Sequence, residues 1–326
     1  MAGSDGEFQL IDRLLKPLAR HPASLGLTDD AAVLTPGPGR QIVLTKDMLV
    51  EGVHFRQGET AADIAAKALR VNLSDLAAMG AAPVAYLMAL SLDPGKRGEW
   101  LADFVRGLAD DQTRYGMSLI GGDMTATPGP MTVSITALGE VPQGQAVRRS
   151  TARPGDAILV SGTIGDAALG LALARGDIIA GDGTVDAYLL ERYRRPQPRT
   201  ALAALVREMA SAAIDISDGL AADLGHVARE SGVRAVIEAE RVPLSPEARR
   251  LMDDHPGLLP FILSGGDDYE LVLTMTAGDA VRACEKAADI HIPLTLIGHI
   301  EAGEGVAILD AEGREVRLDR PGFRHF

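Results

Sequence analysis

Aspartate residues gather where apolar segments of this chain end. Asp47 follows the extended run 42–44, and Asp123 follows the strand-like run 118–120 after two glycines. Because functional residues of α/β folds tend to lie at the mouths of buried strands, we expect such carboxylates to converge. The aspartates in these positions, together with Asp75 on a helical stretch, are Asp29, Asp30, Asp47, Asp75, Asp123, Asp215, Asp218, Asp267 and Asp268.

Converging carboxylates repel one another and raise each other's pKa, so a cluster of them is tolerable when hard cations occupy it. Mg²⁺ prefers oxygen ligands and usually shares its coordination shell with water and substrate phosphates. An acidic pocket that holds Mg²⁺ attracts a polyphosphate, even in a chain whose formal net charge is −13. The pattern therefore indicates a metal site suited to a phosphate-containing substrate.

Each acidic position also has a purely structural interpretation. Asp and Gly are the usual turn formers, so the Gly-Gly-Asp at 121–123 could be a plain turn. The pair 217–218 could cap the following helix, and the pair 29–30 could form a solvated turn. Asp75 could be a surface carboxylate. These interpretations leave unexplained why five separate acidic loops repeat the arrangement, and this repetition favours the metal site.

The standard phosphate-binding motifs are missing from the sequence. Neither Gly-x-x-x-x-Gly-Lys-[Ser/Thr] nor Gly-x-Gly-x-x-Gly behind a strand occurs, which disfavours a P-loop kinase and a Rossmann dehydrogenase. Metals, main-chain amides of Gly-rich loops and scattered basic residues would have to hold a nucleotide. Arg148, Arg149 and Arg153 are candidates because guanidinium groups bind phosphate through planar donor forks, although they could also form a solvated linker.

The composition is typical of a globular protein with two domains. Its 326 residues suffice for two cores, and the low aromatic content of 4% leaves Ala, Val, Leu and Ile to build them. The negative charge disfavours nucleic acid and anionic membranes as partners. The single cysteine, Cys284, excludes an intramolecular disulfide and a Cys-based zinc site. The acidic start and the apolar stretch 81–92, shorter than the ~20 residues of a membrane span, predict a cytoplasmic protein.

Hydrophobic periodicity predicts alternating helices and strands on both sides of a break at 141–155. The predicted helices are 8–18, one starting at 60–63, a further run ending at 79–80, 100–116, 166–175, 200–211 and 220–230. The predicted strands are 41–44, 83–92, 117–120, 131–138, 157–160, 212–216, 233–238 and 269–276, with another ending near 263 and a turn at 181–183. We therefore expect two α/β or α+β domains, 1–145 and 146–326.

Six segments in fixed order carry a resemblance to a known family. They are 28–32, 47–55, 72–80, 121–123, 215–220 and 264–271. Through them the chain resembles the thiamine-monophosphate kinases, within the superfamily of aminoimidazole ribonucleotide synthetase-like ATP-binding proteins. The resemblance covers nearly the whole chain, from 6–8 to 322–323, and the run Leu-Val-Glu-Gly-Val-His-Phe at 49–55 is its most specific part.

The resemblance implies an α/β (α+β) two-domain fold and a homodimer in which the sheets of the N-terminal domains pair. It implies ATP-dependent phosphorylation of thiamine monophosphate to thiamine diphosphate, with several Mg²⁺ ions. ATP would bind mainly the N-terminal domain, and thiamine phosphate would reach it across a cleft.

The resemblance also assigns roles to individual residues. The implied metal ligands are Asp30, Thr45, Asp47, Asp75, Asp123, Asp215 and Asp218. The implied ATP contacts are Tyr115, Gly122, Asp123, Arg149 and Ser217. The implied contacts with thiamine phosphate are His54, Asp267 and Phe323. Taken alone, His54 would be interpreted as a packed or surface histidine, and its place after Glu-Gly-Val reverses that interpretation.

Three positions depart from the family pattern. Lys46 stands where the family usually has a second hydroxyl residue before the aspartate, so a backbone carbonyl would have to replace one side-chain metal contact. Asp267 stands where Glu is common, which shortens its reach to substrate. Phe323 stands where Trp is common, and its ring can still stack on a thiamine ring.

The expected reaction is a direct in-line transfer, because phosphoryl transfer requires positioning and charge neutralisation more than covalent help. The acceptor phosphate oxygen is already anionic, so no strong base and no catalytic nucleophile are expected. One alternative is another ATP-using enzyme of the superfamily, such as aminoimidazole ribonucleotide synthetase; selenophosphate synthetase is disfavoured because no Cys lies near the N-terminus. A second alternative is a non-catalytic nucleotide- or metal-binding protein.

Overall fold

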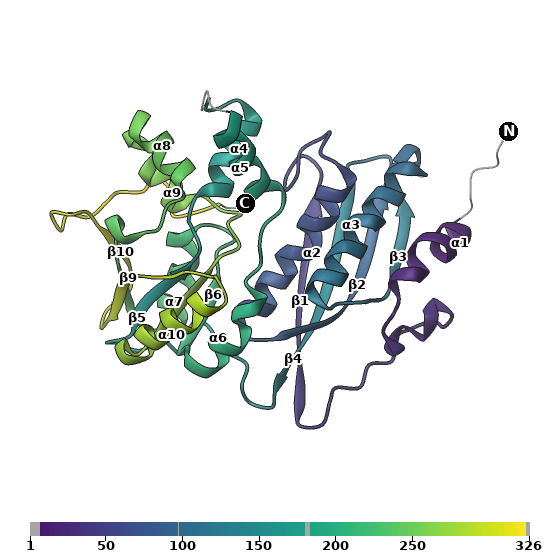
Figure 1. The fold of residues 1–326 in the computed structure, drawn as a ribbon, viewed down its shortest axis with the longest axis horizontal. Coiled ribbons are helices and arrows are strands. Elements are labelled where there is room, and N and C mark those ends of the chain that lie inside the picture. The colour runs from purple at the N-terminus through teal and green to yellow at the C-terminus, as the bar shows by residue number, and fades with distance from the viewer. Residues whose placement is uncertain (1–6, 97, 180–182, 324–326) are drawn as a thin grey trace. The chain divides into compact units, whose positions relative to one another are not determined.

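The computed structural model describes residues 7–96, 98–179 and 183–323, which form two compact units (Figure 1). Unit 1 comprises Met1–Leu76 and Ala81–Gly144, and unit 2 comprises Ala77–Gly80 and Gln145–Phe326. Each unit has its own β-sheet and its own helices. The mixed α/β class with two domains, as expected from the sequence, is therefore confirmed.

Unit 1 contains a four-stranded sheet in the order β1-β4-β2-β3. Its strands are β1 (Arg40–Val50), β2 (Ala82–Leu92), β3 (Leu119–Ala126) and β4 (Thr132–Pro142). β2 and β3 are parallel, whereas β4 pairs antiparallel with both β1 and β2. β1 and β3 are consequently the two edge strands of the sheet.

Two long helices, α2 (Ala61–Ala78) and α3 (Glu99–Tyr115), lie side by side on one face of this sheet (Figure 1). α3 ends where Gly116 adopts a left-handed conformation, as the sequence predicts. The segment before β1 contains the short helices α1 (Glu7–Leu10), η1 (Ile11–Leu15), η2 (Lys16–Leu18) and η3 (Pro22–Leu27), and η4 (Pro94–Lys96) precedes α3. The other face is partly covered by this N-terminal segment, whose Ala23 packs with Ala85, Ile120 and Leu138.

Unit 2 contains a six-stranded sheet in the order β10-β7-β9-β5-β8-β6, in which only β10 and β7 pair in parallel. Its strands are β5 (Ala157–Ser161), β6 (Ala212–Asp215), β7 (Arg234–Glu238), β8 (Leu271–Met275), β9 (Leu294–Glu301) and β10 (Gly305–Leu309). Its helices are α4 (Asp166–Arg175), α5 (Gly183–Arg194), α6 (Ala203–Met209), α7 (Leu220–Ser231), α8 (Pro246–Asp254), α9 (Leu259–Ser264) and α10 (Ala277–Asp289), with short turns η5 (Thr200–Leu202), η6 (Ala239–Arg241) and η7 (Pro256–Leu258).

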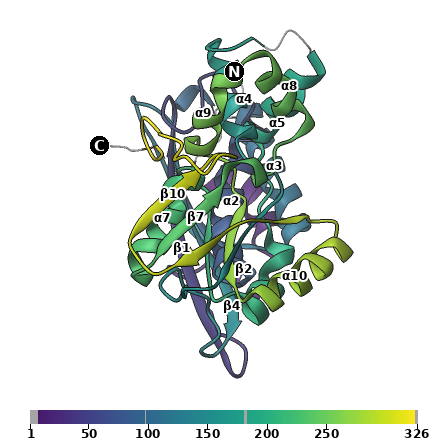
Figure 2. The same cartoon turned by 90° about the vertical axis from the view of Figure 1, so that its left-hand side faces the viewer.

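Helices cover both faces of this second sheet, and strands β5, β6 and β8 are buried at every residue. Along β5, Ile158 and Val160 join a core cluster with α4, α5 and α7, whereas Leu159 joins a second cluster with α6 and α10. Figure 2 shows α7 and α10 on opposite sides of the sheet. The alternation of side chains along a strand thus builds two cores from one sheet.

Three local predictions differ from the structure. Asp47 and Asp123 lie within β1 and β3 rather than after them, because these edge strands continue their pairing through polar residues on a partly solvated sheet. The strand predicted near 263 is helix α9, whose Pro260 suits the first helical turn. The two helical runs predicted between 60 and 80 form one helix. The turn predicted at 181–183 falls mostly outside the described residues.

None of the described helices combines the length and apolar character needed to span a membrane.

Candidate functional site

A first group of predicted site residues joins β1 to α2. Thr45 and Asp47 are two positions apart on β1, so both point toward the helix-covered face of the sheet. The Thr45 hydroxyl donates a hydrogen bond of 2.5 Å to Asp75 Oδ2 on α2. The Asp47 main-chain N–H donates to Asn72 Oδ1 at 3.1 Å, and Asn72 lies one helical turn before Asp75 on α2. Lys46, between the two, is exposed on the opposite face, so its side chain takes no part in this group.

This group concentrates negative charge in a partly buried place. Burial, the charge of Asp75 and a hydrogen bond with Asp75 together raise the pKa of Asp47 to about 7. Two neighbouring carboxylates and a threonine hydroxyl offer only oxygen ligands, which is the donor set that Mg²⁺ prefers. The chemistry of these residues therefore fits a hard divalent cation.

A second group surrounds a pocket of about 670 Å³ within unit 1. Asp30 and its neighbour Asp29 enter this pocket from the loop before β1, and Gly122 and Asp123 enter it from β3. Most of the remaining lining is apolar. The pocket thus combines an apolar interior with three carboxylates, a combination suited to a ligand with an apolar ring and metal-bound phosphates.

The two acidic groups of unit 1 lie on opposite faces of its sheet. Asp47 is aligned across the strands with Ile135 of β4 and Gly122 of β3, whereas Asp123 is aligned with Ser134 of β4. Directly paired residues share a face, so neighbouring rows point in opposite directions. The carboxylates of unit 1, which we expected to converge, therefore form two groups instead of one.

Gly122 is required by close packing within the sheet. Its φ is +153°, and a Cβ atom at this position would lie 1.9 Å from the Met88 carbonyl oxygen of β2. No side chain can occupy that space. Gly122 is also exposed and lines the pocket beside Asp123.

Tyr115 and His54, two further residues predicted to bind substrates, occupy defined places in unit 1. The Tyr115 ring, at the end of α3, lies near the guanidinium groups of Arg70 and Arg114, at 5.8 and 5.4 Å from the ring centroid. His54 lies in the turn after β1, where its Nδ1 accepts the Val50 N–H at 3.0 Å. Because this nitrogen is an acceptor, the ring proton belongs on Nε2.

Main-chain hydrogen bonds bring four predicted site residues of unit 2 together. The Asp267 N–H donates to the Ser217 carbonyl at 2.8 Å, and the Phe323 N–H donates to the Asp218 carbonyl at 3.0 Å. The Phe323 side chain remains 49% exposed. Asp215, the last residue of β6, is buried just before this assembly. Substrate and metal contacts predicted from distant parts of the sequence thus share one set of loops.

Asp223 organises the same loop, although it is not among the residues predicted from the sequence. Its Oδ2 accepts the N–H groups of Ser217, Asp218 and Gly219 at 3.0, 3.0 and 3.1 Å. Burial, followed by the charge of Asp218, raises the pKa of Asp223 to about 7. An aspartate in the first turn of a predicted helix, four residues after Gly219, was the available signal.

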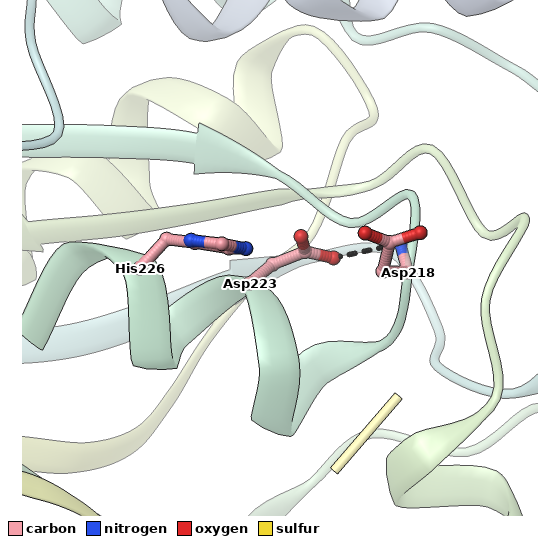
Figure 3. Close-up of side chains that lie close together, drawn as sticks. All are labelled: Asp218, Asp223 and His226. Atoms are coloured by element: carbon pink, nitrogen blue, oxygen red, sulfur yellow. Dashed lines mark hydrogen bonds between the residues drawn. The ribbon is translucent and has the colours of Figure 1, made fainter. Parts of the chain in front are cut away.

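Within the described ranges, Asp218, Asp223 and His226 form the one group of three Asp, Glu, His or Cys side chains that lie close enough together to hold a metal ion (Figure 3). Each offers an atom within 4.8 Å of the others, and Asp223 and His226 lie one turn apart on α7. Arg229 donates to His226 Nδ1 at 2.7 Å. Burial, then Arg229 and Arg149, lower the pKa of His226. Arg149 therefore lies close enough to His226 for its positive charge to disfavour protonation of the imidazole ring.

Sequence reasoning also missed a buried ionic network in unit 2. Glu270 contacts Arg192 and Arg199, and Arg192 lies 3.7 Å from Asp166. Asp268 is buried beside them, and its pKa is raised because burial disfavours the charged form. The partners are distant in sequence, so no local sequence pattern predicts the network.

Comparisons with known proteins agree over nearly the whole chain. The family profile named "AIR synthase related protein, N-terminal domain" matches residues 28–141, and "AIR synthase related protein, C-terminal domain" matches 153–310. A thiamine-monophosphate kinase of Caulobacter vibrioides is 44% identical over 98% of this chain and 90% of its own. The crystal structure of a thiamine-monophosphate kinase from Stenotrophomonas maltophilia has a TM-score of 0.85 and 42% identity, covering 95% of this chain and 98% of that one.

A solved structure with ligands is also similar. AaThiL complexed with AMPPCP and TMP has a TM-score of 0.79 and 31% identity, covering 98% of this chain and 97% of that one. Hydrogenase maturation proteins HypE share the fold at 22% identity. The similarity to the kinases thus extends through both units.

Proposed function

The chain belongs to the AIR synthase related family and to its thiamine-monophosphate kinases, and from this membership we propose how its residues perform the reaction. It transfers the γ-phosphoryl group of ATP to thiamine monophosphate, which gives thiamine diphosphate. The observation that carries this conclusion is similarity to such kinases across 98% of the chain.

Mg²⁺ is proposed to bind through the aspartate groups. In unit 1 the ligands would be Thr45, Asp47 and Asp75 in one group and Asp30 and Asp123 in the other. The raised pKa of Asp47 supports this assignment, because a cation would relieve the repulsion between Asp47 and Asp75. In unit 2 Asp215 and Asp218 are proposed as ligands of further ions. When bound, Mg²⁺ supplies neutralisation of phosphate charge.

ATP is proposed to bind mainly to unit 1, beside Asp123. The pocket near Gly122 offers apolar surface for a base and exposed main chain for phosphates. Tyr115 offers a ring face at the end of α3. Arg149 and Ser217 of unit 2 are also proposed as ATP contacts, the arginine through its planar donor fork.

Thiamine monophosphate is proposed to contact His54, Asp267 and Phe323. The Val50 N–H favours the His54 tautomer with a proton on Nε2, which can donate to a phosphate oxygen. The Asp267 carboxylate can attract the cationic thiazolium ring. The exposed Phe323 ring can stack on a heteroaromatic ring of the substrate.

The chain's own groups would act by positioning and charge neutralisation. The acceptor is a phosphate oxygen that is already anionic, so no side chain has to remove a proton from it. His54 and Arg149 would place donors on the phosphates, and direct in-line transfer follows without a phosphoenzyme. Incubation with γ-labelled ATP should therefore leave no label covalently bound to the protein.

The test is to follow thiamine diphosphate by chromatography after mixing protein, ATP, thiamine monophosphate and Mg²⁺. Product should form, should require Mg²⁺ and should be lost in Asp47→Asn. Asp103→Asn, a change of an exposed aspartate in the same unit, is the matched control and should remain active. Wild-type protein that is folded and binds ATP but makes no product would contradict the conclusion.

A homodimer is proposed to form through the exposed face of the unit 1 sheet. Leu44 and Met48 of β1 are 64% and 57% exposed. The register places both on the face opposite α2, on the edge strand farthest from β3 and its pocket. Exposed apolar side chains on one sheet face favour its burial against a second copy.

A further inference from the structure

The segment 267–270 alternates between outward and inward side chains in an unusual backbone conformation. Asp268 and Glu270 are 1% and 0% exposed, whereas Asp267 and Tyr269 are partly exposed. The φ angles of Asp267 and Tyr269 are +71° and +51°, which side chains other than glycine rarely adopt. Such a conformation persists only where surrounding contacts impose it.

Asp268 fixes the segment to the start of α4. Its Oδ2 accepts the Gly165 N–H at 2.7 Å, and its Oδ1 accepts the Ala167 N–H at 3.2 Å. Both oxygens are thus used by two amides that helix geometry would otherwise leave without partners. The carboxylate can satisfy both only in one orientation, so it sets the direction of the main chain at Asp267.

Glu270 fixes the other end of the segment. Its carboxylate accepts from Arg192 Nη2 at 2.8 Å, from Arg199 Nε at 2.6 Å and from the Ser161 hydroxyl at 2.6 Å. The Ser161 hydroxyl in turn accepts the Leu271 N–H at 2.9 Å. These contacts come from β5, α5 and the segment that follows α5.

The segment also holds the loop that bears Ser217 and Asp218. The Asp267 N–H donates to the Ser217 carbonyl and the Tyr269 N–H to the Ile216 carbonyl, both at 2.8 Å. The Ile216 N–H returns a hydrogen bond to the Glu270 carbonyl at 2.8 Å. The loop is thus held by main-chain hydrogen bonds that a change of the Asp268 side chain leaves in place, so such a change acts on the outward carboxylate of Asp267 rather than on Ser217.

We propose that Asp268, supported by Glu270, is a positioning residue that holds Asp267 in the orientation needed to bind thiamine monophosphate. The inference rests on the proposed role of Asp267 and adds to it. Burying a carboxylate is costly, and apolar packing would fill the same space without that cost. Directional hydrogen bonds accepted by both oxygens impose one backbone conformation, which apolar packing does not.

The first experiment compares Asp268→Asn with the wild-type kinase in steady-state assays. The amide NH₂ of Asn would face an N–H donor, so one of the two anchoring hydrogen bonds is lost. We expect the KM for thiamine monophosphate to rise about tenfold, with kcat and the KM for ATP changed less than about twofold. Asp156→Asn is the control, because Asp156 is also buried, accepts the Arg153 N–H and lies at the other end of β5. Its KM values should remain those of the wild type.

A double-mutant cycle with Asp267→Asn separates positioning from general damage. If Asp268 acts through Asp267, the double variant should bind thiamine monophosphate no more weakly than Asp267→Asn alone, as measured by calorimetry. Additive losses, or an unchanged KM in folded Asp268→Asn, would overturn the inference while leaving the kinase function intact. An unchanged KM in Asp267→Asn would refute the role of Asp267 and the inference with it.

If Asp268→Asn fails to fold, Ser161→Ala decides the question. It removes one hydrogen bond to Glu270 and one acceptor for the Leu271 N–H, without changing charge. We expect its KM for thiamine monophosphate to rise about two- to threefold at unchanged KM for ATP. Equal changes in both KM values, or none in either, would count against the proposal.

Discussion

The hydroxyl of Thr45 lies 2.5 Å from a carboxylate oxygen of Asp75, although the two residues are thirty positions apart in sequence. The contact joins the middle of β1 to α2 and holds Asp75 next to Asp47. Two carboxylates in a partly buried place oppose folding unless a proton or a cation neutralises one of them. The arrangement thus links the stability of unit 1 to pH and to metal.

We predict that Asp47→Asn stabilises the metal-free protein at pH 8. The folded pKa of Asp47, about 7, lies above its ordinary value of 3.8, so the folded state binds the proton more tightly than the unfolded state. Stability from this group is lost as pH rises from about 4 to about 7, and the full penalty persists above pH 7. The gain should be on the order of 1–2 kcal/mol at pH 8, discounted for partial exposure, and should vanish near pH 4.

Chelator-treated protein and thermal or urea unfolding would measure this effect. Asp103→Asn, an exposed aspartate paired with Arg106, should show no comparable pH-dependent gain. A variant less stable than the wild type at pH 8 would show that Asp47 makes stabilising contacts that outweigh its repulsion.

Thr45→Val should raise the Mg²⁺ requirement of the kinase. Valine keeps the shape of threonine but removes the hydroxyl that orients Asp75. We expect the Mg²⁺ concentration for half-maximal activity to rise about three- to tenfold at saturating substrates, because the carboxylate is held less firmly and one oxygen ligand is lost. A Mg²⁺ titration of the rate measures this, and an unchanged titration curve would remove Thr45 from the metal site.

Local sequence signals predicted the ends of several elements correctly. Gly116 and Gly176 adopt left-handed conformations after α3 and α4, where the sequence predicted helix ends. Asp215 stands at the end of β6, as its strand-then-turn pattern indicated. These features depend on a few neighbouring residues, which is why sequence alone reveals them.

Features that depend on tertiary pairing were not predictable in the same way. The sequence predicted that Asp47 and Asp123 follow their strands. In the structure, pairing of β1 with β4 and of β3 with β2 extends both strands across these polar residues, and sequence alone does not reveal that pairing. Their placement on opposite sheet faces follows from register alone. The contact of Glu270 with Ser161 spans 109 positions, and no local pattern marks it.

Gly122→Ala should unfold unit 1 or weaken it severely. The added Cβ would lie 1.9 Å from the Met88 carbonyl oxygen, which belongs to the main chain of a paired strand and has little freedom to move. We expect a loss of about 3 kcal/mol or more in unfolding free energy. Gly121→Ala is the matched control, because its Cβ would meet only the flexible end of Leu87 at 3.0 Å. Similar losses in the two variants would refute the steric explanation.

Leu44→Glu combined with Met48→Glu should dissociate the proposed homodimer. Both side chains are exposed on one face of β1. Glutamates at these positions would bring negative charges of one copy against negative charges of the other, and their repulsion would oppose association. Analytical ultracentrifugation should show monomer for the variant and dimer for the wild type. Val281→Glu, at an equally exposed apolar position of unit 2, should leave the mass unchanged. A monomeric wild type would contradict the dimer itself.

Phe323 provides the most direct test of substrate stacking. Its N–H is bound to the Asp218 carbonyl while its ring is 49% exposed, so the ring can be changed without disturbing that main-chain contact. We expect Phe323→Ala to raise the KM for thiamine monophosphate about five- to tenfold, and Phe323→Trp to leave it unchanged or lower it, because indole offers more stacking area. The KM for ATP should stay constant in both. An alanine variant with the wild-type KM for thiamine monophosphate would show that the ring does not touch the substrate. A tryptophan variant whose KM is as high as that of the alanine variant would show that the space beside Phe323 is too small for stacking to determine affinity.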